Sequence, residues 1–85
     1  MEIIKKIYSE SFENISSGKK KFELRLADEK YNIGDILVLK EIDSDRKFTG
    51  REIKKKISYI ARTKDCNYWP QDDMNKYGFI IIQLE

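Results

Sequence analysis

The sequence contains no histidine and only one cysteine, Cys66, among its 85 residues. Without histidine the chain has neither serine–histidine nor cysteine–histidine nucleophiles, and it lacks the usual zinc ligands. A single cysteine forms neither an intrachain disulfide nor a cysteine metal cluster, so we expect it to be inert. The adjacent carboxylates Asp72 and Asp73 match no metal spacing. The sequence therefore predicts no metal and no cofactor.

Long apolar segments are also missing. No segment is long enough to span a bilayer, and the N-terminal residues 1–6 lack the apolar run of a signal peptide. We therefore expect a cytoplasmic protein without a membrane partner. The length suits one domain, which we place at residues 1–85, and the sequence does not indicate an oligomeric state.

Charged residues make up 38% of the chain, although the net charge is only +2. Segments 18–25 and 51–56 are basic, whereas segment 65–85 is acidic. A basic face opposed by an acidic one points to a polyanionic partner. The run Lys54–Lys56 is either the solvent-exposed face of a strand or, if it lies beside a binding cleft, a row of cations that contacts successive phosphates of a ligand.

Apolar periodicity and turn signals predict a mainly β (α+β) domain with about five strands and one early helix. The strands are expected at residues 3–7, 20–26, 36–39, 51–60 and 79–84. The helix is expected from Ser9, its N-cap, to Ser17, with Gly18 as its C-terminal cap. This order suits a small, mostly antiparallel barrel.

The apolar pattern also predicts which faces of the strands are buried. Residues 36–39 and 79–84 are apolar enough to be covered on both faces. Within residues 20–26, Phe22 and Leu24 share one parity and are expected to be buried, which leaves Glu23 and Arg25 on the opposite face.

Two loops interrupt the predicted strands. Residues 32–35 signal a turn with Gly34 at its centre. Residues 61–77 form the one long irregular stretch and include Tyr68-Trp69-Pro70. Trp69 either stacks on a nucleobase or plugs an open barrel end as part of the core.

Three motifs resemble those of one known family. Gly18-x-Lys20-x-x-Glu23-x-Arg25 matches the G-x-K-x-x-E-x-R signature of ASCH domains in the PUA-like superfamily. The element 33–39 resembles the glycine–aspartate turn and strand that come next in such domains. Segment 48–52, Phe-Thr-Gly-Arg-Glu, is similar to a Y-T-G-R-E-I step in a small bacterial and phage branch of unknown function.

The resemblance implies a PUA-like β-barrel with a cleft between the early helix and the sheet. Lys20, Glu23 and Arg25 would line the cleft, and Gly18 would allow the tight turn from helix to strand. We add Arg51, from the third motif, and Trp69 as further ligand-binding candidates. Family members are thought to bind RNA or nucleotide-like ligands, and a few are small hydrolases.

The chain departs from the family at several positions. Residues 26–29 replace the polar stretch that follows the signature arginine in relatives, and the N-terminal histidine of many relatives is missing. Hydrolases that act on modified nucleosides have a threonine where Glu23 stands.

Three functions remain open at this point. The first is a binding module for RNA or a nucleotide-like ligand, without catalysis. The second is a hydrolase of a modified nucleoside or of single-stranded RNA that uses the same residues. The third is a protein-interaction domain whose basic face docks an acidic partner. Glu23 and Arg25 also have a purely structural interpretation, a surface ion pair contributing about 0–1 kcal/mol.

Overall fold

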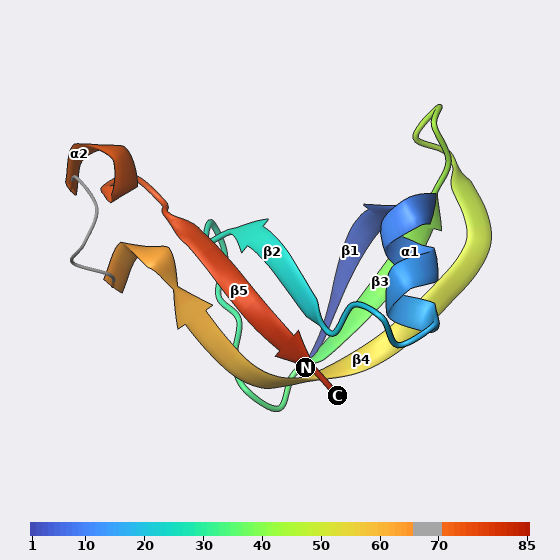
Figure 1. The fold of residues 1–85 in the computed structure, drawn as a ribbon, viewed down its shortest axis with the longest axis horizontal. Coiled ribbons are helices and arrows are strands. Elements are labelled where there is room, and N and C mark those ends of the chain that lie inside the picture. The colour runs from blue at the N-terminus through green and yellow to red at the C-terminus, as the bar shows by residue number, and fades with distance from the viewer. Residues whose placement is uncertain (66–70) are drawn as a thin grey trace.

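The computed structural model describes residues 1–65 and 71–85. It is a small, mostly-β domain in which five strands form one mixed sheet with the order β1-β3-β4-β5-β2 (Figure 1). In chain order the elements are β1 (Glu2–Tyr8), α1 (Ser9–Ser16), β2 (Phe22–Leu26), β3 (Ile36–Ile42), β4 (Phe48–Arg62), a 3₁₀ turn (Thr63–Asp65), α2 (Gln71–Met74) and β5 (Phe79–Leu84). The predictions made for Cys66, Tyr68 and Trp69 lie outside the described residues.

Strand β4 connects the two halves of the sheet. Its first part pairs antiparallel with β3 and its second part with β5, with a register shift between Ile57 and Tyr59. Strand β1 pairs parallel with β3, and β2 pairs antiparallel with β5. The sheet is bent, and its edge strands β1 and β2 lie on either side of its open side (Figure 1). The sheet is therefore not closed, and the predicted barrel is not confirmed.

The five predicted strands are present, and the early helix is confirmed. Gly18 follows the helix with a φ of +83°, and its N–H donates to the Ile15 carbonyl at 3.1 Å, as expected for a C-terminal cap. The prediction of Ser9 as N-cap is wrong: Tyr8 occupies that position and no side chain caps the helix. The predicted loop 61–77 begins too early, because β4 continues to Arg62.

The core lies between α1 and the inner face of the sheet. Helix α1 contributes Phe12 and Ile15, three residues apart on one side of the helix. Strand β3 lies between two neighbours, and its residues 37–39 are all buried, as the continuous apolar run predicted. The turn before β3 places Gly34 at a φ of +97°, a conformation that favours glycine.

Two predictions of buried faces are wrong. On β2 the buried residue is Glu23, 3% exposed, whereas Phe22 and Leu24 are 49% and 55% exposed. On β5 the residues alternate, so that Ile80 and Ile82 are buried but Phe79 and Ile81 are not. The alternation predicted for β2 is confirmed, but the structure buries Glu23 and exposes Phe22 and Leu24, the reverse of the prediction. Alternation alone cannot say which face meets the core, because that depends on the register with β5.

Candidate functional site

Lys20, Glu23 and Arg25 meet at the open side of the sheet. The Nε of Arg25 donates to Oε2 of Glu23 at 2.9 Å, and Nζ of Lys20 lies 3.7 Å from Oε1 of the same carboxylate. Lys20 also donates to the Ser11 hydroxyl on α1 at 3.4 Å. The side chain of Glu23 is only 4% exposed, and those of Lys20 and Arg25 are about one quarter exposed. A nearly buried carboxylate thus pairs with two largely buried cations.

Arg25 spans the gap between the two edge strands. Its Nη2 donates to the backbone carbonyl of Lys6 on β1 at 2.9 Å. This bond links β2 to β1 where no backbone ladder joins them among the described residues. Within residues 1–65 and 71–85 the third guanidinium nitrogen, Nη1, has no hydrogen-bond partner. Its two N–H groups are free to bind an acceptor.

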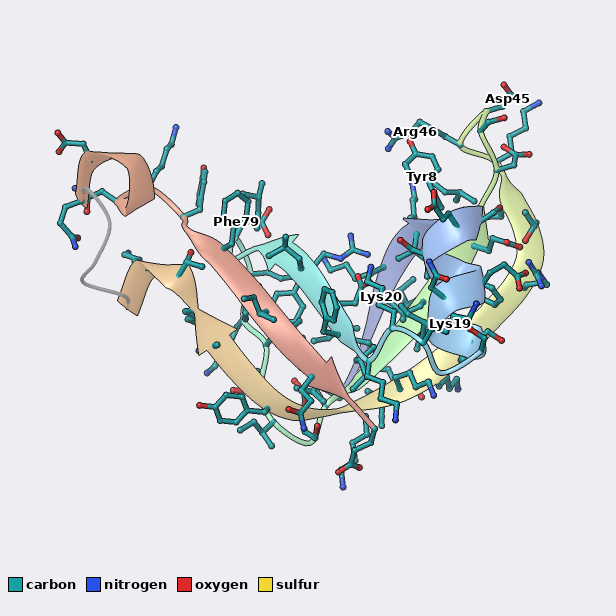
Figure 2. All side chains as sticks on the ribbon, viewed as in Figure 1. Tyr8, Lys19, Lys20, Asp45, Arg46 and Phe79 are labelled. Carbon is teal, nitrogen blue, oxygen red and sulfur yellow. The ribbon has the colours of Figure 1, made fainter. Side chains whose placement is uncertain are left out.

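The three residues line an open pocket of about 250 Å³ between α1, the end of β1 and β2. Its lining is Lys6, Ile7, Tyr8, Ser11, Lys20, Glu23, Leu24 and Arg25. Figure 2 shows Tyr8 at the far end of β1 and Lys20 between β2 and α1. Three cationic side chains and one carboxylate line the pocket, so its charge favours an anionic ligand.

A second pocket, of about 150 Å³, adjoins the first because Lys20 lines both. Lys21 and Lys55 also line it. Lys55 lies opposite buried Leu37 in the register of β3 and β4, on the face that carries Ile53 and Ile57. Its neighbours Lys54 and Lys56 have the other parity and are exposed. Of the lysine run, only Lys55 therefore lies beside the signature residues.

Arg51 lies outside this pocket. Its Nε and Nη2 donate to the two oxygens of Glu41 at 2.8 and 2.7 Å, and Nη2 also donates to Glu13 of α1 at 2.6 Å. Its guanidinium carbon is 4.7 Å from the centre of the Phe12 ring. The Thr49 hydroxyl donates to Glu41 at 2.5 Å. These contacts of Arg51 join α1, β3 and β4, and Arg51 also lines a separate open pocket with Phe48 and Gly50.

Glu41 is a residue that the sequence reasoning missed. It is 2% exposed, and hydrogen bonds from Arg51 and then Thr49 lower its pKa from 4.5 to about 2. The same contacts raise the pKa of Arg51 above its ordinary value. A lone carboxylate beside apolar Ile42 in a central strand was the signal that could have revealed it. Lys6 and Ser11 were missed as well, and no pattern marks them.

A second charged cluster lies beside a pocket that shares Leu24 and Arg25 with the pocket over Lys20 and Glu23. Lys5 forms an ion pair with Glu29 and lies 5.6 Å from the centre of the Tyr31 ring. The hydrogen bond from Lys5 lowers the pKa of Glu29, and burial raises the pKa of Tyr31. Arg25 lines the pocket next to this cluster too, so its guanidinium lies between two charged groups of side chains.

The described part of the chain holds no group of three histidine, cysteine, aspartate or glutamate side chains placed to bind a metal. In the same residues, no helix is long and apolar enough to cross a membrane.

Comparison with known proteins identifies a family and a fold. Residues 4–75 match a family described as "Domain of unknown function (DUF3850)". The crystal structure of the hypothetical protein PH0355 has a similar fold, with a TM-score of 0.70. The two chains are 22% identical, and the match covers 100% of this chain and 98% of that one. No curated protein matches the chain.

Proposed function

The chain belongs to the DUF3850 family, and we propose that it is a binding module for RNA or a nucleotide-like ligand. The ligand binds in the pocket over Lys20, Glu23 and Arg25. One observation carries this proposal: three signature residues from one short segment converge in an open, positively charged pocket. Such a pocket attracts a phosphate-bearing ligand.

Arg25 is the main contact in this proposal. The Glu23 carboxylate fixes its orientation through Nε, and the Lys6 carbonyl fixes Nη2. The free Nη1 then donates to a phosphate or carbonyl oxygen with little further loss of entropy. Tyr8, half-exposed in the lining of the same pocket, offers a ring on which a base can stack.

The scaffold we propose is a PUA-like domain of the ASCH type. Its support is the order of the elements: α1 lies between β1 and β2, the signature segment leads into β2, and the Thr49–Gly50–Arg51 step lies early in β4. The side chain of Arg25 bridges β2 and β1 at the open side.

A binding function requires fewer chemical groups in this pocket than hydrolysis does. A hydrolase needs a general base with a free lone pair facing the substrate. The nearly buried carboxylate of Glu23 already has a cation beside each of its oxygens. We therefore propose no catalytic residue.

The test is the affinity of Arg25→Ala for a short, labelled, single-stranded RNA, measured by fluorescence anisotropy. Removing a charged hydrogen-bond donor costs about 1.5–3 kcal/mol, so we expect binding to weaken roughly 10- to 100-fold. Binding by the unmodified protein should also weaken as salt rises. Arg46→Ala is the matched control, because Arg46 is exposed in the turn between β3 and β4 and is not among the residues that line the pocket.

Equal affinity of the Arg25→Ala and Arg46→Ala variants would contradict the proposal. Because Arg25 also links two strands, thermal melting must show that its variant is folded. If it is not, Lys20→Gln provides the same comparison without removing that link. RNA cleavage, or turnover of an acetylated nucleoside, that disappears in Lys20→Ala would instead support the hydrolase.

The second pocket leads to a separate prediction about the lysine run. Lys55→Gln should weaken RNA binding several-fold and make it less sensitive to salt, because one phosphate contact is lost. Lys54→Gln removes the same charge from the opposite face of β4, and we expect almost no effect. The comparison uses the slope of log affinity against log salt concentration. Identical slopes for the two variants would exclude Lys55 from the ligand site.

A further inference from the structure

The outer face of strands β2 and β5 is apolar. It carries Phe22, Leu24, Leu26, Phe79 and Ile81, which we call the outer apolar face. The register places Leu24 opposite Ile81 and Leu26 opposite Phe79, so these side chains share one side of the sheet. Figure 2 shows Phe79 at the start of β5, away from α1.

Strand β4 extends this face without adding a charge. Tyr59 lies opposite Gln83, which in turn lies opposite Phe22, and Ala61 lies opposite Ile81. All three added residues are exposed. An uncharged face across three strands is unusual in a chain of which 38% of residues are charged.

The outer apolar face is large enough to form a protein–protein interface. Its five side chains are 41–55% exposed. With the three neighbours they present on the order of 700 Å², close to the ~800 Å² that each partner buries in a standard interface. Contiguous apolar patches of this size on small soluble proteins usually mark an interaction surface.

We propose that a second copy of this chain covers the outer apolar face. The area matches what a stable dimer buries. An uncharged face meets its own copy without like-charge repulsion, although each chain has a net charge of +2. Lys20 reaches the edge of this face, where its Nζ lies 5.3 Å from the centre of the Phe22 ring, but Phe22 and the other residues of the face carry no charge to hold a polyanion.

The strand order suggests how two copies pack. Strand β5 is the middle strand of the face, so a two-fold axis along it is self-complementary. Such an axis places Ile81 next to the partner subunit's Ile81. It also places Leu24 over the partner subunit's Ala61, a large side chain over a small one, as in well-packed sheet pairs.

The dimer adjoins the candidate ligand site at β2. Glu23 and Arg25 alternate with the outer residues along β2, but Leu24 belongs to the outer apolar face and also lines the pocket. The outer apolar face and the ligand pocket therefore share an edge at Leu24. The dimer does not depend on the proposed function.

The test is the mass in solution, measured by light scattering at about 100 μM, well above the Kd of a micromolar dimer. We expect twice the chain mass of 10.1 kDa. Ile81→Lys should give the monomer mass, because two ammonium groups would meet at the axis. Mixing Ile81→Lys with Ile81→Glu should restore the dimer. Ile33→Lys is the matched control: Ile33 is 62% exposed in the turn before β3, and its variant should remain dimeric.

A monomeric unmodified protein would overturn the proposal and leave the face to a different partner. A dimer that persists in Ile81→Lys would place the interface elsewhere. Far-UV circular dichroism shows whether each variant is folded. If Ile81→Lys is not, Leu24→Lys makes the same comparison from β2.

Discussion

An Ile82→Ala variant should lose about 2–5 kcal/mol of stability, the range for truncating a buried isoleucine to alanine. Ile82 is 0% exposed and lies between Glu23 of β2 and Ile60 of β4 in the sheet. The next residue back, Ile81, has the same side chain but is 41% exposed. We expect Ile81→Ala to cost less than about 1 kcal/mol.

The measurement for this pair is urea unfolding followed by circular dichroism, at a protein concentration low enough that self-association does not contribute. Similar losses in the two variants would contradict the alternation along β5. They would also show that the outer apolar face is covered within a single chain.

Arg51→Met should cause the largest loss of stability of any single charge removal in the described residues. The substitution removes the guanidinium that binds both oxygens of the Glu41 carboxylate, and this carboxylate is only 2% exposed. A charge left unpaired in this way is strongly destabilising. Methionine keeps the stem over the Phe12 ring, so the packing loss is small. We expect the melting temperature to fall by on the order of 10 °C.

Arg46→Met is the control, since Arg46 lies exposed in the turn between β3 and β4, and it should change the melting temperature little. If both variants melt alike, Glu41 does not depend on Arg51.

The pH dependence of stability gives a second check on the same pair. The pKa of Glu41 in the folded protein is about 2, below its ordinary 4.5. Its contribution is therefore fully present above pH 4.5 and is lost as the pH falls towards 2. The melting temperature of the unmodified protein should fall more steeply across this interval than that of Arg51→Met. Equal slopes would exclude Arg51 as the cause of the shift.

Much of the secondary structure could be predicted because it depends on local signals. The apolar run at residues 36–39, the positive-φ glycines 18 and 34 and the helical spacing of Phe12 and Ile15 each mark an element within a few residues. The order of the strands in the sheet and the parallel pairing of β1 with β3 have no such local signal. The pairings of β1 with β3 and of β2 with β5 join residues more than thirty positions apart.

The candidate site could be predicted in part. The signature motif singled out Lys20, Glu23 and Arg25, and the fold brings them into one pocket. The same reasoning grouped Arg51 with them, but β4 carries Arg51 to Glu41 and Glu13 instead. The pocket's other polar contacts, the Lys6 carbonyl and the Ser11 hydroxyl, come from elements that the motif does not include.

The sequence by itself determined the five strands, the early helix, the alternation along β2, and the side-by-side placement of Glu23 and Arg25. Periodicity is enough for these, since neighbours two apart on a strand share a face whatever surrounds it. Only the tertiary structure decided that Glu23 faces inward and Leu24 outward. That choice depends on the register between β2 and β5, and the Ser11 hydroxyl of α1 and the Lys6 carbonyl of β1 accept hydrogen bonds from the two cations that pair with Glu23. It gives the domain a charged pocket around Glu23 and an apolar face next to it.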